Sequence, residues 1–168
     1  MKKDNKKCAD LVYEKYQRTL KDYQNAFNYF DIDKDKRENP DLLYYVNRSG
    51  LSFEIDNNQY KGCKDLFDYV NRSGLSFDYV EANTFEDQKS GFWRFQMSWG
   101  GPSDEFRIYT DHENNIDYIE YWYLDWVDGA FIRVNDDIIY HICEMFLECS
   151  AEMEVATTKK QYVFNKWR

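Results

Sequence analysis

The chain has 168 residues, the usual size of one domain, and its 15 Tyr, 12 Phe and 5 Trp exclude an intrinsically disordered chain. Its formal net charge of −9 disfavours direct binding to nucleic acid or to an anionic membrane, and it favours a basic protein as partner. No run approaches the roughly 20 apolar residues that span a bilayer, so we expect a single cytoplasmic domain over residues 1–168.

The N-terminal part of the chain is predicted to be helical. Between residues 8 and 30, apolar residues recur at spacings of three and four, which is the pattern of an amphipathic helix with one buried face. The highly charged segment that follows, from Asp31 to Pro40, is expected to end this helix.

A tandem duplication occupies residues 41–80. Residues 41–55 and 65–79 share the sequence YVNRSGLSF at an offset of 24 residues. We interpret each copy as a short helix, closed by a glycine (Gly50 or Gly74) in the left-handed conformation and followed by an extended segment. Two copies are too few for a solenoid. The duplicated unit is therefore either an addition to an older fold or a doubled contact surface.

Residues 92–134 carry the clearest strand pattern and are predicted to form a four-stranded antiparallel sheet. Apolar and polar residues alternate from Phe92 onward, and the run Gly-Gly-Pro at residues 100–102 ends the first strand. Polar residues 111–115 form the next expected turn. Apolar groups would lie on both faces of this sheet, so we expect helices or the duplicated unit to cover at least part of each face.

The last two strands are expected to form a hairpin around Asp128-Gly129, a dipeptide that is favoured in two-residue turns. Residues 130–134 would then return beside the strand that begins at Ile116. In that register Trp126 lies opposite Phe131.

A second amphipathic helix is predicted over residues 136–154, with Asn135 as a possible cap and acidic residues in its first turn. Residues 159–168 alternate basic and aromatic side chains and are expected to form an edge strand or a tail. The predicted fold class is therefore α+β, with helices from both ends of the chain packed on the sheet.

Sequence motifs of catalysis and metal binding are missing. The chain has no Gly-rich phosphate loop, no GxSxG and no HExxH, and its only histidines are His112 and His141. The four cysteines lack the two-residue spacing of a zinc site, so we expect no metal and no cofactor. The best enzymatic alternative is a pocket that contains Glu120, Arg94 and Arg107, because buried carboxylates beside arginines occur in active sites.

The strongest functional signal is a group of ten carboxylates within 34 residues that contain only two basic side chains. Held at fixed positions on a sheet, such carboxylates can imitate a run of phosphates and occupy a cationic nucleic-acid channel. The alternative is ordinary surface acidity that keeps the chain in solution. The predicted partner-binding residues are Asp104, Glu105, Asp111, Glu113, Asp117, Glu120, Asp125, Asp128, Asp136 and Asp137.

Two segments, SWGGPSDEFR at residues 98–107 and EYWYLDWVDGA at residues 120–130, resemble small uncharacterised acidic proteins of bacterial plasmids and phages. The resemblance covers residues 92–130. It implies a counter-defence role of the anti-restriction or anti-CRISPR type, since several such proteins look like acidic DNA mimics. It implies no particular site residue, because it supplies no characterised site.

We therefore predict a non-catalytic inhibitor from a mobile element that binds a basic surface of a host defence protein, such as a nuclease complex that binds nucleic acid. One alternative is an immunity protein or antitoxin that masks a cognate toxin through specific hot spots. Another is a small enzyme or ligand-binding domain. Clustering of the ten carboxylates on one exposed surface would favour the first two hypotheses, and a deep pocket around Glu120 would favour the third.

Overall fold

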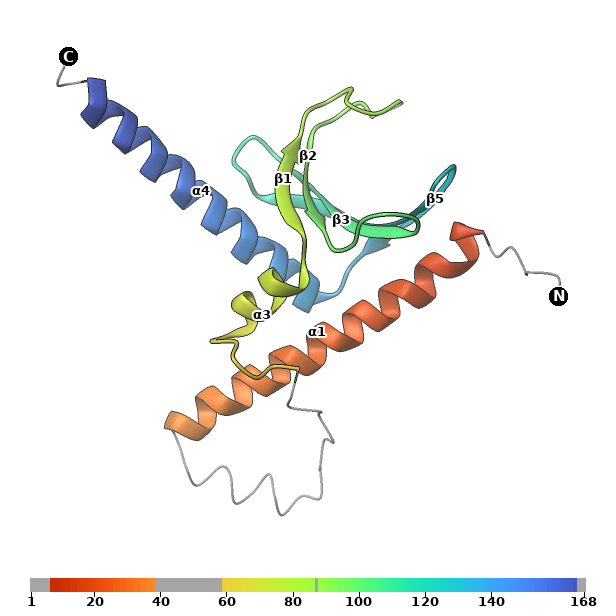
Figure 1. Cartoon of the computed structure of the whole chain (residues 1–168), viewed down its shortest axis with the longest axis horizontal. Coiled ribbons are helices and arrows are strands. Elements are labelled where there is room, and N and C mark those ends of the chain that lie inside the picture. The colour runs from red at the N-terminus through yellow and green to blue at the C-terminus, as the bar shows by residue number, and fades with distance from the viewer. Residues whose placement is uncertain (1–6, 39–58, 87, 166–168) are drawn as a thin grey trace.

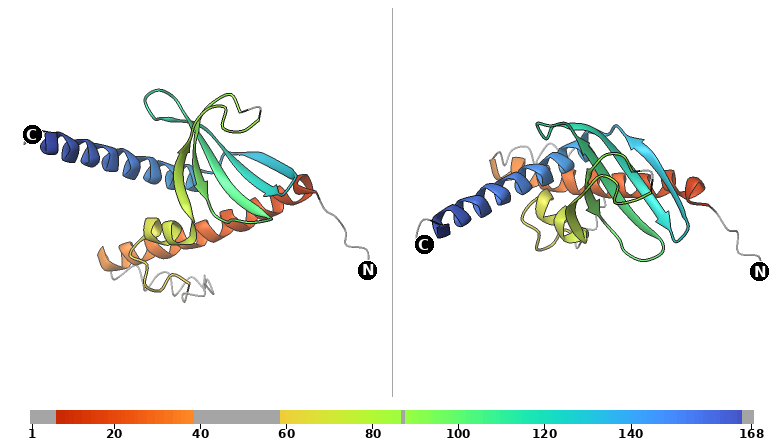
Figure 2. Two further views of the ribbon diagram at one scale, coloured as in Figure 1. Left: turned by 45° about the horizontal axis from the view of Figure 1, so that its top comes forward. Right: turned by 90° about the horizontal axis from the view of Figure 1, so that it is seen from above.

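The protein has an α+β fold in which helices pack on one face of an antiparallel sheet, as Figure 1 and Figure 2 show. The computed structural model describes residues 7–38, 59–86 and 88–165. In chain order the elements are α1 (Cys8–Glu38), α3 (Leu66–Ser73), β1 (Ser76–Val80), β2 (Phe92–Gln96), β3 (Ser103–Thr110), β4 (Ile116–Asp125), β5 (Asp128–Val134) and α4 (Asp137–Asn165).

The sheet is a meander in which each strand pairs antiparallel with the next strand along the chain, in the order β1-β2-β3-β4-β5. Successive side chains of a strand point to opposite faces. Phe106 of β3 therefore lies opposite Tyr121 of β4 on the face that the helices cover, where both are buried. Glu105 and Arg107 lie on the other face. The two faces are called here the helix face and the open face.

Helix α1 supplies the largest part of the helical layer and contacts β4 and β5. Its buried residues Val12, Tyr16, Leu20 and Tyr23 recur at spacings of three and four, which confirms the predicted amphipathic helix. The helix continues beyond residue 30 to Glu38, because the charged residues that follow are compatible with a helix and the first proline comes later.

Helix α4 begins directly after β5 and diverges from α1, so that the two helices form a V with α3 between them (Figure 1). Its buried residue Phe146 packs against Phe77, Phe95 and Phe67. The predicted edge strand or tail at residues 159–168 is wrong for residues 159–165, which continue the helix. This segment contains neither glycine nor proline, so nothing in it ends a helix.

Strand β1 makes the sheet five-stranded, and the predicted number of four is therefore wrong. This strand is the extended part of the second copy of the duplication, and Phe77 in it lies opposite Phe95 of β2. The segment joins the sheet because Phe77 stacks on Trp93 and Phe146. The first copy, residues 41–55 with Gly50, lies outside the described residues, so the duplicated unit as a whole stays a prediction.

Helix α3 has the predicted position, but its end has a different geometry. Asp65 caps the first turn by accepting a hydrogen bond of 2.8 Å from the backbone N–H of Asp68. Gly74 at the other end has φ −92°, so the predicted left-handed conformation is wrong. A Cβ atom on Gly74 would lie 2.3 Å from Cε2 of buried Phe95. Glycine is needed here for a close approach and not for its conformation.

The hairpin of β4 and β5 turns at Trp126-Val127, so the predicted turn at Asp128-Gly129 is wrong. Asp125 pairs with Asp128, and Trp122 instead of Trp126 lies opposite Phe131. The rings of Trp122 and Phe131 stack with their centroids 4.7 Å apart. Cross-strand pairing over the length of both strands outweighs the local preference of one dipeptide.

Candidate functional site

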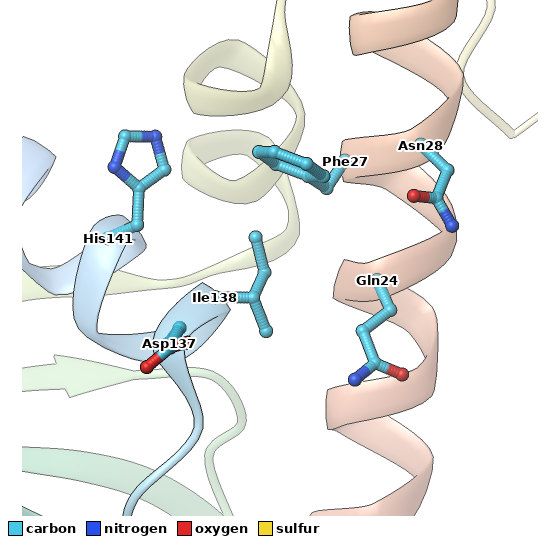
Figure 3. A pocket seen from close by; sticks show the side chains of 6 residues that line it. All are labelled: Gln24, Phe27, Asn28, Asp137, Ile138 and His141. Atoms are coloured by element: carbon cyan, nitrogen blue, oxygen red, sulfur yellow. The ribbon is translucent and has the colours of Figure 1, made fainter.

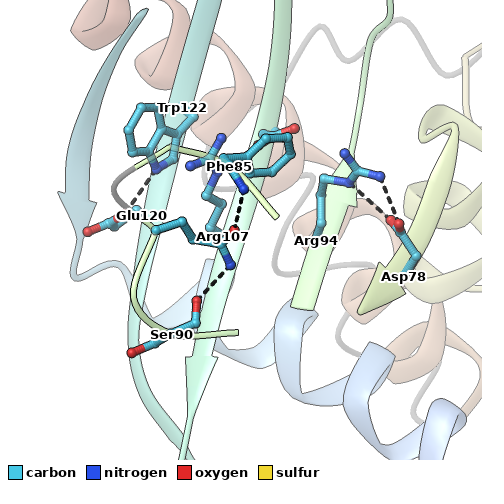
Figure 4. Close-up of polar contacts among 9 residues, drawn as sticks. Asp78, Phe85, Ser90, Arg94, Arg107, Glu120 and Trp122 are labelled. Carbon is cyan, nitrogen blue, oxygen red and sulfur yellow. Dashed lines mark hydrogen bonds and ion pairs between the residues drawn. The ribbon is translucent and has the colours of Figure 1, made fainter. Parts of the chain in front are cut away.

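Two of the ten predicted carboxylates are buried on the open face, where they bind the protein's own side chains. Arg107 donates to Glu105 over 2.7 Å, and both side chains are nearly inaccessible to solvent. Arg107 also lies over the ring of Trp122, with its Cζ atom 3.9 Å from the ring centroid. Glu120 accepts a hydrogen bond of 2.9 Å from Nε1 of Trp122 (Figure 4). A partner cannot reach Glu105 or Glu120 directly.

The arginines of the open face also bind the protein's own side chains. Arg94 donates two hydrogen bonds, of 3.1 and 2.7 Å, to the carboxylate of Asp78 on the neighbouring strand (Figure 4). Arg133 lies over the ring of Tyr118 at 3.7 Å. Each contact joins adjacent strands, so this arrangement stabilises the sheet and leaves its arginines little freedom to bind a substrate.

Three further predicted carboxylates hold the fold together. Asp104 accepts hydrogen bonds from the hydroxyls of Ser98 and Tyr121. Asp128 accepts the backbone N–H of Cys8, and Asp136 accepts the hydroxyl of Tyr16. The backbone N–H of Cys8 is also the main reason why the pKa of Asp128 lies below the usual carboxyl value.

The other five predicted carboxylates are exposed but lie at separate places. Three of them, Asp111, Glu113 and Asp117, lie in or beside the turn between β3 and β4. Asp125 lies at the other end of β4, and therefore at the opposite end of the sheet. A strand of this length places its two ends about 30 Å apart. Asp137 belongs to the first turn of α4. The fold thus does not gather the ten carboxylates into one array.

A groove of about 610 Å³ lies between α1 and α4 (Figure 3). Phe27 and His141 face each other across it edge to face, with ring centroids 6.3 Å apart. Its walls combine apolar groups with neutral amides and a single carboxylate. The lining residues are Gln24, Phe27, Asn28, Asp137, Ile138 and His141.

A smaller hollow of about 330 Å³ lies at the end of the sheet where β4 turns into β5. We call it the tryptophan hollow. Its walls include the two most exposed tryptophans in the described part of the chain, Trp126 with 91% of its surface exposed and Trp99 with 78%. Neither hollow is lined by Glu120, Arg94 or Arg107. The residues of the tryptophan hollow are Trp99, Gly100, Ser103, Leu124 and Trp126.

The tryptophan hollow is built from two tight connections. Trp126 has φ 47°, a conformation that bulky residues rarely adopt, and it is followed by the fully exposed Val127. The indole lies against Gly101, where an added Cβ would be 2.3 Å from its Nε1. The loop that carries Trp99 is closed by the backbone N–H of Met97, which donates to the carbonyl of Asp104 over 3.0 Å.

Sequence reasoning missed this site because its two tryptophans are 27 residues apart and come to line one hollow only through the pairing of β3 with β4. The local signals at both places, Gly-Gly-Pro at residues 100–102 and the Asp-Gly dipeptide at residues 128–129, indicated turns but not that the turns lie side by side. Exposed tryptophans are enriched at protein interfaces and are not typical of solubilising surfaces.

The remaining features add no ligand site. Among the described residues, no group of three His, Cys, Asp or Glu side chains is placed to hold a metal ion. None of the helices described combines the length and the apolar character needed to cross a membrane. No protein-family model, curated protein or solved structure matches the chain.

Proposed function

We propose that the protein is a non-catalytic inhibitor that binds a basic surface of a nucleic-acid-handling protein through the tryptophan end of its sheet. The tryptophan end consists of the tryptophan hollow together with Asp125, Val127 and Asp128. The observation that carries this proposal is the exposure of Trp126 and Trp99 on tight connections beside Asp125.

Two aspects of the surface support a protein as partner. Large exposed aromatic side chains supply most of the binding energy at many protein interfaces, where tryptophan and tyrosine are enriched. The net charge of −9 and the exposed Asp125 favour a basic partner and accelerate the encounter with it. The resemblance to plasmid and phage proteins suggests a host defence protein as the target.

An immunity protein or antitoxin is the second candidate function, and one specific observation favours it. The clustering of carboxylates that would have favoured both inhibitor hypotheses is not found, and the observation that favours this candidate is instead the pair of exposed tryptophans, Trp99 and Trp126, in one hollow. A surface of this kind recognises one partner through hot spots, as toxin inhibitors do, more readily than it replaces a run of phosphates.

A binding experiment tests the proposal. The immobilised protein is exposed to a bacterial lysate at increasing salt, and the retained proteins are identified. We expect a basic, nucleic-acid-binding protein that is released at moderate salt, because salt screens the attraction between exposed charges. The Asp125→Lys and Trp126→Ala variants should both retain much less of it.

Asp117→Lys is the matched control for Asp125→Lys. It makes the same change of charge on the same strand, but near the other end of the sheet, and its retention of the partner should equal that of the unchanged protein. Asp128 is a poor choice for charge reversal, because it also binds the start of α1. Equal loss of binding in the two lysine variants would show that net charge alone, and not the tryptophan end, determines the interaction.

A further inference from the structure

We propose that the tryptophan hollow receives an arginine side chain of the partner, which stacks on the indoles of Trp99 and Trp126. This inference depends on the proposed function, since it specifies what the tryptophan end recognises. It follows from the size of the hollow, from the chemistry of its walls and from the net charge of the protein.

The size and the walls of the hollow favour a single long side chain. Its 330 Å³ correspond to about ten water molecules in the liquid. Ser103 is the one lining residue with a polar side-chain oxygen, whereas Leu124 and the two indoles present apolar surface. Water against such walls is poorly bound, so a side chain with an aliphatic stem gains free energy by displacing it.

The indole faces and the net charge of −9 favour a cationic side chain among the long ones. Asp125 and Asp128 flank the turn that carries Trp126, but they lie on the helix face, where Asp128 binds the start of α1. Leu124 and Ser103 of the hollow lie instead on the open face. The face of an indole carries a partial negative charge and attracts cations, more strongly than a phenol or phenyl ring does. A second copy of this chain is a poor occupant, because two copies that each carry a charge of −9 repel one another.

Arginine fits better than lysine because its guanidinium group is flat and weakly hydrated. The protein already contains this arrangement on the same face of its sheet, where Arg107 lies 3.9 Å from the centroid of the Trp122 ring. Backbone oxygens in a glycine-rich loop and the Ser103 hydroxyl are acceptors that a guanidinium group can reach with its several N–H donors.

Titration of the whole protein with small probes tests this inference without any partner. The probes are N-acetylarginine amide, N-acetyllysine amide and N-acetylleucine amide, and the readout is the NMR signals of the five indole N–H groups. Trp99→Phe and Trp126→Phe variants assign the two signals of the hollow. The Trp122 signal is an internal reference, since its N–H is bonded to Glu120.

We expect the arginine probe to shift the Trp99 and Trp126 signals in a saturable way, with binding several-fold tighter than that of the lysine or leucine probe. Trp126→Ala should weaken binding about tenfold, which is the size of one partly desolvated cation–π contact. Gly101→Ala is a milder variant that leaves both indoles present. It should also weaken binding, because its Cβ would displace the Trp126 indole.

Other outcomes overturn the inference in distinguishable ways. Tightest binding of the leucine probe would identify an apolar pocket, and tightest binding of the lysine probe would exclude the guanidinium stack. Shifts spread equally over all five indoles, or none at all, would show that the hollow is not a site. If a basic partner is nevertheless retained in the lysate experiment, the proposed function survives while this inference fails.

Discussion

The backbone N–H of Cys8, the first residue of α1, donates a hydrogen bond of 2.7 Å to Oδ2 of Asp128 at the start of β5. A carboxylate from a distant hairpin thus caps the helix, where its negative charge also interacts favourably with the positive end of the helix dipole. The contact joins the N-terminal helix to the strand farthest from β1.

Replacement of Asp128 by alanine should therefore lower the free energy of unfolding. Asp125→Ala, at the paired position of the same hairpin, is the control and should have a smaller effect, since among the residues that the structure describes its side chain makes no hydrogen bond to the helix. Urea unfolding followed by circular dichroism measures both. Equal midpoints for the two variants would contradict a capping role for Asp128.

Acid should destabilise the protein through three carboxylates. The pKa values of Asp68, Asp111 and Asp128 are lowered, chiefly by hydrogen bonds from the Lys64 backbone, the Asn115 side chain and the Cys8 backbone, respectively. These three carboxylates bind protons less readily in the folded protein than in the unfolded chain. Their contribution to stability is therefore complete above the ordinary carboxyl pKa, and it is lost as pH falls through the pKa values of the folded protein. Unfolding midpoints measured between about pH 7 and pH 3 should decline, and less steeply for Asp128→Asn.

Asp22 should have the opposite effect on the pH dependence of stability. Burial raises its pKa, although the hydroxyl of Tyr69 donates to it over 2.8 Å. A carboxylate of this kind contributes stability that is present below the unfolded pKa and is lost as pH rises through the folded pKa. Asp22→Asn should therefore be more stable relative to the unchanged protein at pH 7 than at about pH 4, as measured by the same unfolding experiment. A pH-independent difference would contradict this.

The helices and most strands could be predicted from the sequence because their signals are local. The spacing of Val12, Tyr16, Leu20 and Tyr23 defines the buried face of α1 without reference to any other element. Strand β1 could not be predicted with equal ease, because a short extended segment does not reveal which edge it will join. Its place depends on Phe77, which needs the aromatic side chains of β2 and α4 as neighbours.

The candidate site was less predictable than the fold. An acidic residue on a strand has no signature that distinguishes an exposed carboxylate from one held by the protein's own groups. Glu105 offered one clue, since Arg107 lies two residues away and therefore on the same face. The position of Trp126 depends on the hairpin register, and that register is determined by pairs such as Trp122 with Phe131 and not by the Asp-Gly dipeptide.

Gly74→Ala should destabilise the protein by about 1 to 3 kcal/mol, which is typical of overpacking in a core. The new Cβ would lie 2.3 and 2.5 Å from two atoms of the Phe95 ring, and Phe95 is itself fixed against Phe146. The backbone conformation of Gly74 suits alanine, so the cost comes from the contact alone. Unfolding by urea provides the measurement.

A double-mutant cycle identifies the source of that cost. Phe95→Leu removes the ring edge that the new methyl group meets, so Gly74→Ala combined with Phe95→Leu should lose less stability than the sum of the two single variants. Strict additivity would show that Gly74 is required for a reason other than the contact with Phe95.

The Glu105–Arg107 pair should be strongly coupled, because both side chains are nearly inaccessible to solvent and Arg107 lies over the rings of Phe92 and Trp122. Arg107→Met leaves the carboxylate of Glu105 buried without its cation, and removal of one partner from a buried pair typically costs about 3 to 5 kcal/mol. Glu105→Gln in the same background removes that uncompensated charge. The double variant should therefore be more stable than Arg107→Met alone, as urea unfolding would measure. If the double variant is instead no more stable than Arg107→Met, the uncompensated charge of Glu105 does not account for the loss, and the ring contacts of Arg107 do.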